Sequence, residues 1–203
     1  QEIKIDYDAI VIGAGIAGLY QLYKLREIGL NVRVFEAGTG VGGTWYWNRY
    51  PGARFDSESY SYAYSFSQEL LDEWNWSEHF ASQPEILRYL QHMANKFDLI
   101  KDIEFSSDVK AAVYDEPSRT WEITLENGSK HRSRYLIAGI GLLSQPTMPK
   151  IEGVESFQGP SFHTSRWPHE PVDFSDKRVA VIGTGASGIQ AIQEISKDVE
   201  QLT

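Results

Sequence analysis

Three glycines near the start of the chain have the spacing of a phosphate-binding turn. Gly13, Gly15 and Gly18 form a G-x-G-x-x-G pattern directly after the apolar run 8–12 and directly before a helical pattern. The first glycine permits a tight bend, the second lets the backbone approach a pyrophosphate, and the third allows helix and strand to pack closely. Because N–H groups at a helix start are unpaired and electropositive, they favour a phosphate there. We therefore predict a dinucleotide site at this turn.

An acidic residue strengthens this prediction. Glu36 ends the next apolar run, residues 31–36. A carboxylate at that place accepts hydrogen bonds from the hydroxyls of a ribose. The alternative is a purely structural turn with a solvated glutamate, but the strand, turn, helix and acid occur here in the required order.

The same pattern returns late in the chain. Gly183, Gly185 and Gly188 follow the apolar run 178–182 and precede a second helical pattern. Two such turns predict two dinucleotides, and the pair indicates a flavin and a nicotinamide that act together. The alternative for the second turn is a repeat retained for folding. The position that would distinguish NADPH from NADH falls after Thr203.

The elements around these turns predict an α/β fold with two Rossmann-like dinucleotide-binding domains and doubly wound parallel sheets. Apolar spacing predicts a helix over 16–28, a second helix over 84–97 and a strand over 178–182. Further strands are expected at 109–115, 120–126 and 129–137, with a hairpin at Asn127-Gly128. We expect these three to form a β-meander over the helical layer. Residues 38–66 lack periodicity, and a stretch this irregular is more often functional than a linker.

Composition excludes several classes of protein. With 19 basic and 28 acidic residues among 203, the net charge of −9 argues against nucleic-acid partners. The absence of cysteine excludes disulfides, thiolate metal sites and a cysteine nucleophile. The five histidines have no metal-ligand spacing, so no metal is expected. The longest apolar run, 135–143, is too short for a membrane helix, and no signal-peptide pattern is present. These features predict a cytoplasmic protein without membrane partners.

A third pattern lies between the two turns. Phe157, Gly159, His163, Trp167 and Pro168 read F-x-G-x-x-x-H-x-x-x-W-P. With its flanking glycine turns, the chain here resembles the type I Baeyer–Villiger monooxygenases. The segments 42–56 and 82–89 are similar to the phenylacetone-, steroid- and cyclic-ketone-oxidising members. The resemblance covers essentially the whole chain and implies an N-terminal portion of a longer protein.

The resemblance implies a reaction and its cofactors. NADPH would reduce FAD, the reduced flavin would form a peroxide with O2 at its C4a carbon, and that peroxide would convert a small ketone into an ester or lactone. The residues implied for FAD are Gly13, Gly15, Gly18, Glu36, Gly43, Thr44, Trp45, Asp56 and Tyr62. Those implied for NADP are Leu143, Gly183, Thr184, Gly185, Ala186, Ser187 and Gly188.

The resemblance also implies roles for single residues. Asp56 would be catalytic by orienting an active-site arginine that falls after residue 203. Histidine is the most frequent general base in enzymes, which makes His163 a candidate for that role. In the family, however, it lies in the interdomain connection, so we expect it to couple domain movement to the reaction. Phe157, Gly159, Trp167 and Pro168 would share that coupling role.

Domain boundaries follow from the same reasoning. Residues 1–144 would form the first segment of the FAD-binding domain, 145–177 an interdomain connection, and 178–203 the start of the NADP-binding domain. One alternative is a flavin monooxygenase that oxygenates nitrogen or sulfur, against which Trp167-Pro168 argues. A second is a nucleotide-binding module without catalysis, which the 203 residues alone would be. An NAD-dependent dehydrogenase without flavin leaves the two turns and the aromatic loop unexplained. The sequence predicts no oligomeric state.

Overall fold

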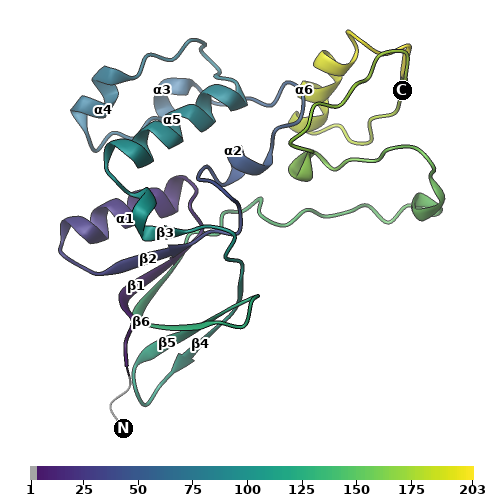
Figure 1. The fold of residues 1–203 in the computed structure, drawn as a ribbon. Helices are drawn as coiled ribbons and strands as arrows, with labels where there is room; N and C mark the ends of the chain where they lie inside the picture. The colour runs from purple at the N-terminus through teal and green to yellow at the C-terminus, as the bar shows by residue number, and fades with distance from the viewer. Residues whose placement is uncertain (1–3) are drawn as a thin grey trace. The chain divides into compact units, whose positions relative to one another are not determined.

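The computed structural model describes residues 4–203, which form two compact units (Figure 1). One unit consists of the residues up to Tyr46 together with Leu87–Ser144. The other consists of Trp47–Ile86 together with Gln145–Thr203. Within the described residues, every helix is too short or too polar to cross a membrane.

The first unit is built on a six-stranded sheet with the order β3-β2-β1-β6-β5-β4. Its parallel pairs are β3 with β2, β2 with β1, and β1 with β6. Because β1 lies between two parallel neighbours, it is the buried central strand that its apolar run predicts. The predicted α/β class is confirmed, with a mostly parallel sheet. The strands are β1 (Tyr7–Ile12), β2 (Val32–Phe35), β3 (Ile103–Glu104), β4 (Val109–Asp115), β5 (Thr120–Leu125) and β6 (Lys130–Ala138).

The β-meander continues this sheet, so the prediction that it lies over the helical layer is wrong. The strand β6 is long enough to pair antiparallel with β5 along its first half and parallel with β1 along its second half. Ser133 lies where the two pairings meet, opposite both Trp121 and Tyr7. The hairpin at Asn127-Gly128 forms as predicted, with the Gly128 N–H donating to the Leu125 carbonyl. The three strands thus extend the parallel sheet on the β6 side.

The helices of the first unit follow the predicted spacing closely. The helix α1 (Ile16–Glu27) contacts β1 and β2 and buries Leu19 and Leu22. The helix α5 (Gln83–Lys96) buries an apolar face, and the residues from Leu87 onward belong to this unit. Two short elements, α2 (Thr44–Trp47) and the 3₁₀ turn η1 (Ile100–Asp102), were not predicted. The strands of the sheet share a buried core of Ile10, Phe35, Ile123 and Leu125.

The second unit contains shorter elements. A two-stranded parallel pair, β7 (Arg178–Val179) with β8 (Gln201–Leu202), flanks the helix α6 (Ala186–Ile195). The strand predicted over 178–182 is regular over Arg178–Val179. The Val181 N–H still donates to the Thr203 carbonyl. The remaining elements are α3 (Ser59–Tyr62), α4 (Gln68–Glu73), η2 (Val154–Ser156) and η3 (Thr164–Arg166).

The core of the second unit joins its two chain segments. Tyr50 and Ala53 from the irregular loop pack against Ala191 and Ile195 of α6. Partly buried side chains from the later segment, including Trp167 and Phe174, cover this cluster. The loop that precedes Asp56 is therefore packed on the helix that follows the second glycine turn.

Candidate functional site

The first glycine turn has the geometry that its pattern predicts. Gly13 has φ +95°, which favours glycine. A Cβ on Gly18 would lie only 1.8 Å from the Gly13 carbonyl oxygen, so the start of α1 packs directly on the turn. Gly15 is the N-cap of α1 with φ −81° and ψ −169°, and no side chain caps this helix start. Amide groups of a first helical turn have no partner within the helix, which suits an anion at this place.

Glu36 lies at the base of this turn. It is only 4% exposed. One carboxylate oxygen accepts from the Ala14 N–H at 2.6 Å and the other from the Gly38 N–H at 2.7 Å. Each oxygen retains a further acceptor site, which can receive a ribose hydroxyl. The carboxylate therefore fits its predicted role and also ties the turn to the end of β2.

A second glycine loop meets the first turn. The Gly42 N–H donates to the Ala14 carbonyl at 3.0 Å. A Cβ on Gly43, whose φ is +53°, would lie 2.8 Å from the Gly15 Cα. Thr44 and the buried Trp45 follow directly on α2. The structure thus brings together seven of the residues predicted for FAD, namely Gly13, Gly15, Gly18, Glu36, Gly43, Thr44 and Trp45.

The second turn has nearly the same backbone as the first. Gly183 has φ +124°, and a Cβ on Gly188 would lie 2.7 Å from the Gly183 carbonyl oxygen. Gly185 is the N-cap of α6 with φ −76° and ψ 174°, close to the angles of Gly15. As at α1, no side chain caps this helix start. Thr184, Ala186 and Ser187 complete the turn, so the residues predicted at 183–188 lie together at the start of α6.

The backbone angles and surroundings of Gly185 indicate whether this turn fits a dinucleotide. Its φ is negative, so backbone strain does not require glycine there. Among residues 4–203, no atom other than those of its chain neighbours lies within 4 Å of a Cβ built on Gly185, so packing within this range does not require glycine either. Close approach of a pyrophosphate gives a reason for the missing side chain. Within the same described range, no cluster of His, Asp or Glu could hold a metal ion.

A comparison with protein-family models agrees with this geometry. A model described as "FMO-like: Flavin-binding monooxygenase-like" matches residues 7–203. The chain belongs to this flavin-binding monooxygenase-like family.

Members of the family with curated names include close relatives of the chain. The acetone monooxygenase (methyl acetate-forming) of Gordonia sp. (strain TY-5) is 50% identical over 96% of the chain and 37% of its own length. Its name describes conversion of a ketone into an ester, which is a Baeyer–Villiger oxidation, so the predicted resemblance is confirmed. The phenazine N-monooxygenase PhzNO1 of Lysobacter antibioticus is 47% identical over 98% of the chain and 37% of its own length. The chain spans little more than a third of these relatives.

A solved structure in the family matches the fold. The OTEMO complex with FAD and NADP (form 3) is 49% identical, with a TM-score of 0.93. The match covers 98% of the chain and 38% of that structure. This likeness to a protein bound to both nucleotides agrees with the two turns described above.

The F-x-G-x-x-x-H-x-x-x-W-P segment is held by its own residues. A Cβ on Gly159 would lie 2.8 Å from the Phe157 ring, so this glycine makes room for that ring. The His163 Nδ1 accepts from the Ser165 N–H at 3.2 Å and lies 2.8 Å from the Ser165 Oγ. His163 thereby caps η3. The Trp167 ring packs beside Phe174, with 6.2 Å between ring centroids.

The remaining predicted residues lie on more exposed parts of the molecule. Asp56 is exposed in a bend of the second unit. Tyr62 ends α3, and its ring centroid lies 4.0 Å from that of Phe55. Leu143 is an exposed residue of the first unit. The roles predicted for these three residues stay predictions.

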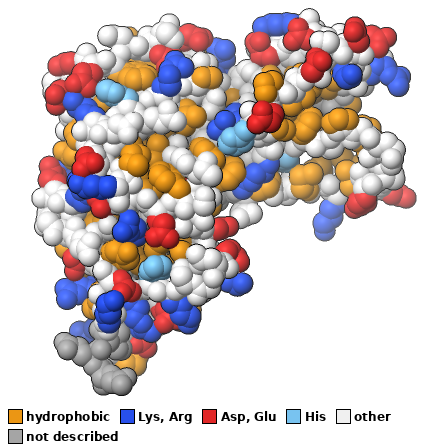
Figure 2. Space-filling model, viewed as in Figure 1, with side chains coloured by type: hydrophobic (Ala, Val, Ile, Leu, Met, Phe, Trp, Pro, Cys, Tyr) orange, Lys and Arg blue, Asp and Glu red, His pale blue; other side chains and the backbone are white. Residues whose placement is uncertain are grey.

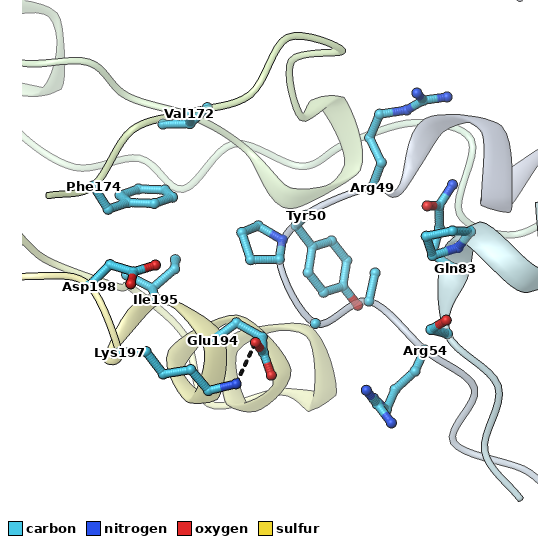
Figure 3. A pocket seen from close by; sticks show the side chains of 15 residues that line it. Arg49, Tyr50, Arg54, Gln83, Val172, Phe174, Glu194, Ile195, Lys197 and Asp198 are labelled. Carbon is cyan, nitrogen blue, oxygen red and sulfur yellow. Dashed lines mark hydrogen bonds and ion pairs between the residues drawn. The ribbon is translucent and has the colours of Figure 1, made fainter. Parts of the chain in front are cut away.

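A cavity of about 550 Å³ lies within the second unit, at the carboxyl end of α6 (Figure 3). The loop 49–54 lines it, together with Val172 and Phe174. Figure 3 shows Arg49 and Arg54 pointing to opposite sides, while Glu194 and Lys197 pair with each other. Asp173 accepts from the Ser175 N–H, which lowers the pKa of its carboxyl below the ordinary value. Because the cavity has no converging charges, we assign it no catalytic role.

Sequence reasoning missed several contacts of the site. Gln190 makes a hydrogen bond to Tyr50 in the loop before Asp56. A polar residue within the apolar pattern of α6 is the sequence feature that could have indicated this contact. Ser165 was also missed, although a serine two positions after His163 could have indicated a local cap. The N–H groups that hold Glu36 belong to backbone and leave no sequence signal beyond the glycine pattern itself.

Proposed function

We propose that this chain is part of a longer protein, of the length of its relatives, which we call the full-length protein. We propose that the full-length protein is a FAD- and NADPH-dependent Baeyer–Villiger monooxygenase. It inserts one oxygen atom of O2 beside a ketone carbonyl and forms an ester or lactone. The observation that carries this proposal is the pair of glycine turns with matching N-caps at Gly15 and Gly185. One turn suits the flavin and the other the nicotinamide cofactor, as the relative bound to both nucleotides suggests.

The first unit binds FAD in this proposal. The turn at 13–18 receives the pyrophosphate, and Glu36 accepts from the ribose hydroxyls. The loop of Gly43, Thr44 and Trp45 continues the site, and the buried indole of Trp45 helps to exclude water. When bound, FAD supplies the chemistry of hydride acceptance and oxygen activation.

The second turn and the exposed residues complete the proposal. Residues 183–188 bind the NADP pyrophosphate, and Leu143 adds an apolar contact to the nicotinamide side. Asp56 orients an arginine of the full-length protein, and Tyr62 covers the flavin. In domain terms, 1–144 begins the FAD-binding domain, 145–177 is the connection, and 178–203 begins the NADP-binding domain.

His163 acts as a clamp of the connection in this proposal and not as a general base. A base must offer a free nitrogen to a proton. The His163 Nδ1 accepts from the Ser165 N–H, so the neutral ring carries its proton on Nε2 and neither nitrogen offers a free lone pair. The Trp167 ring of the same segment packs against the core of the second unit. These contacts support a role in positioning the connection.

One relative favours a second candidate function, which is N-oxygenation. The phenazine N-monooxygenase is nearly as similar to the chain as the acetone monooxygenase. A peroxide that is kept deprotonated attacks a carbonyl, whereas an electrophilic peroxide transfers oxygen to nitrogen. The residues that set this difference lie near the reacting oxygen.

Product analysis tests both functions. The purified full-length protein, with FAD, NADPH and O2, is incubated with a small ketone and separately with a phenazine. We expect ester or lactone from the ketone by mass spectrometry and a visible flavin spectrum. N-oxide without any ester would favour the second function, and a colourless protein after addition of FAD would refute both.

A further inference from the structure

Gln190 is a polar residue in the middle of α6 that the proposed function does not use. Its amide makes three hydrogen bonds to the loop before Asp56. The Oε1 accepts from the Tyr50 hydroxyl at 2.8 Å and from the Arg54 N–H at 3.4 Å. The Nε2 donates to the Arg54 carbonyl at 3.3 Å. The glutamine therefore binds both backbone polar groups of one loop residue.

Only an amide can make this set of bonds. It needs an acceptor and a donor on the same side chain, at the reach of a glutamine. Glutamate could accept from Tyr50 and Arg54 but would place a carboxylate oxygen against the Arg54 carbonyl. Leucine keeps the size and loses all three bonds. The contact is thus specific in chemistry as well as in shape.

The loop also approaches the backbone of the helix here. A Cβ on Gly52, whose φ is +78°, would lie 2.5 Å from the Gln190 carbonyl oxygen. Tyr50 and Ala53 pack against Ala191 beside it. Apolar packing holds the loop on the helix, whereas the directed amide bonds fix its position along and around the helix axis.

The Gln190 contact joins two segments that carry predicted functional groups, namely the second glycine turn and Asp56. Gln190 lies about one and a half helical turns after Gly185, the N-cap of α6 at the second glycine turn. Arg54 lies two residues before Asp56, and the Phe55 N–H between them donates to the Ala81 carbonyl. A shift of the amide would therefore move the segment of Asp56 relative to the second turn.

We propose that Gln190 is a positioning residue, which fixes the loop of Asp56 to the helix of the second turn and so aligns a nicotinamide bound there for reduction of the flavin. This inference rests on the proposed function. It assigns no direct contact with either cofactor to Gln190. The expected consequence is a loss in the rate of flavin reduction without an equal loss of nucleotide affinity.

The test compares Gln190→Leu and Tyr50→Phe in the full-length protein with Gln193→Leu as control. Gln193 is an exposed glutamine on the same helix. Anaerobic stopped-flow absorbance gives the rate of flavin reduction by NADPH, and titration gives the Kd of NADP. Hydrogen exchange of the peptide with Arg54 reports the contact without any turnover.

For Gln190→Leu we expect faster hydrogen exchange at Arg54. Flavin reduction should slow about 10-fold or more, which is about 1.4 kcal/mol. The Kd of NADP should stay within about 3-fold of wild type, which is about 0.6 kcal/mol. Tyr50→Phe, which loses one bond and keeps its ring, should lie between Gln190→Leu and wild type. Reduction rates equal to those of Gln193→Leu would overturn the proposal. So would a Kd that rises as much as the rate falls, because the effect would then be on binding. If wild type itself bound no flavin, the proposed function would fail without any variant.

Discussion

At the scale of residues, each of the three glycines of the second turn is required for a different physical reason. Gly183 needs its positive φ, and Gly188 needs the absence of a Cβ beside the Gly183 carbonyl. Gly185 needs neither among the described residues, and in the proposed function the close approach of a pyrophosphate is its reason. The first turn repeats this logic at Gly13 and Gly18. Structural and binding roles are therefore separable by substitution.

Gly185→Ala and Gly188→Ala should separate them in the full-length protein. Gly185→Ala meets no clash, so we expect a stability loss below about 1 kcal/mol, as for an N-cap change. Its Cβ should weaken NADP binding about 10-fold, or about 1.4 kcal/mol. Gly188→Ala should instead cost about 1–3 kcal/mol through overpacking. Calorimetry and nucleotide titration give both quantities. Equal effects of the two variants on stability would contradict this division.

Glu36→Gln tests the carboxylate of the first turn. Glutamine leaves one of the two N–H donors, of Ala14 or Gly38, facing an NH2 group. An unsatisfied buried donor costs about 1–3 kcal/mol, so thermal stability should fall. FAD affinity should also fall by about 10-fold or more, which is about 1.4 kcal/mol. Glu27→Gln, an exposed glutamate at the end of α1, is the control. Unchanged FAD affinity in Glu36→Gln would exclude the ribose role.

At the scale of elements, the sequence predicts the helices and strands that are long enough to contain several repeats of an apolar pattern. The helix α1 and the strand β4 agree closely with the prediction because repeated apolar residues set their bounds. The four-residue helices α2 and α3 are shorter than one repeat of any pattern, so they were missed. The pairing of β6 with both β1 and β5 depends on tertiary contacts, which explains the misplaced meander. The site follows the same division, with the glycine turns predicted and the Gln190 contact missed.

The 3₁₀ turn η3 offers a test of His163 at this scale. His163 caps it through the Ser165 N–H, and asparagine is also a good cap. We expect His163→Ala to destabilise the protein by about 1 kcal/mol and His163→Asn to restore that loss. Loss of a general base would cost both variants about 100-fold or more in kcat. We instead expect His163→Asn to stay within about 10-fold of wild type, measured as NADPH-dependent ester formation. Equal inactivity of both variants would support the base role.

At the scale of the whole molecule, the two units differ in what stabilises them. The first unit has a six-stranded sheet with a buried central strand. Among the described residues of the second unit, the sheet has only two strands of two residues each. Sheets of two short strands are marginal alone. Apolar side chains of the second unit, such as Phe157 and Ile182, also lie on the surface. Figure 2 shows hydrophobic side chains exposed on one face of the molecule.

The 203 residues expressed alone should therefore open locally in the second unit before the first unfolds. Hydrogen exchange should show fast amides in 178–182 and slow amides in β1, because β1 has strands on both sides. We expect this chain to bind FAD weakly and to form no ester, since it spans little more than a third of its relatives' length. The full-length protein under the same conditions is the control. Ester formation by the isolated chain would show that 13–18 and 183–188 can act together without the rest of the protein. Equal protection of both regions would show that the α6 core of Tyr50, Ala53, Ala191 and Ile195 suffices to stabilise the second unit.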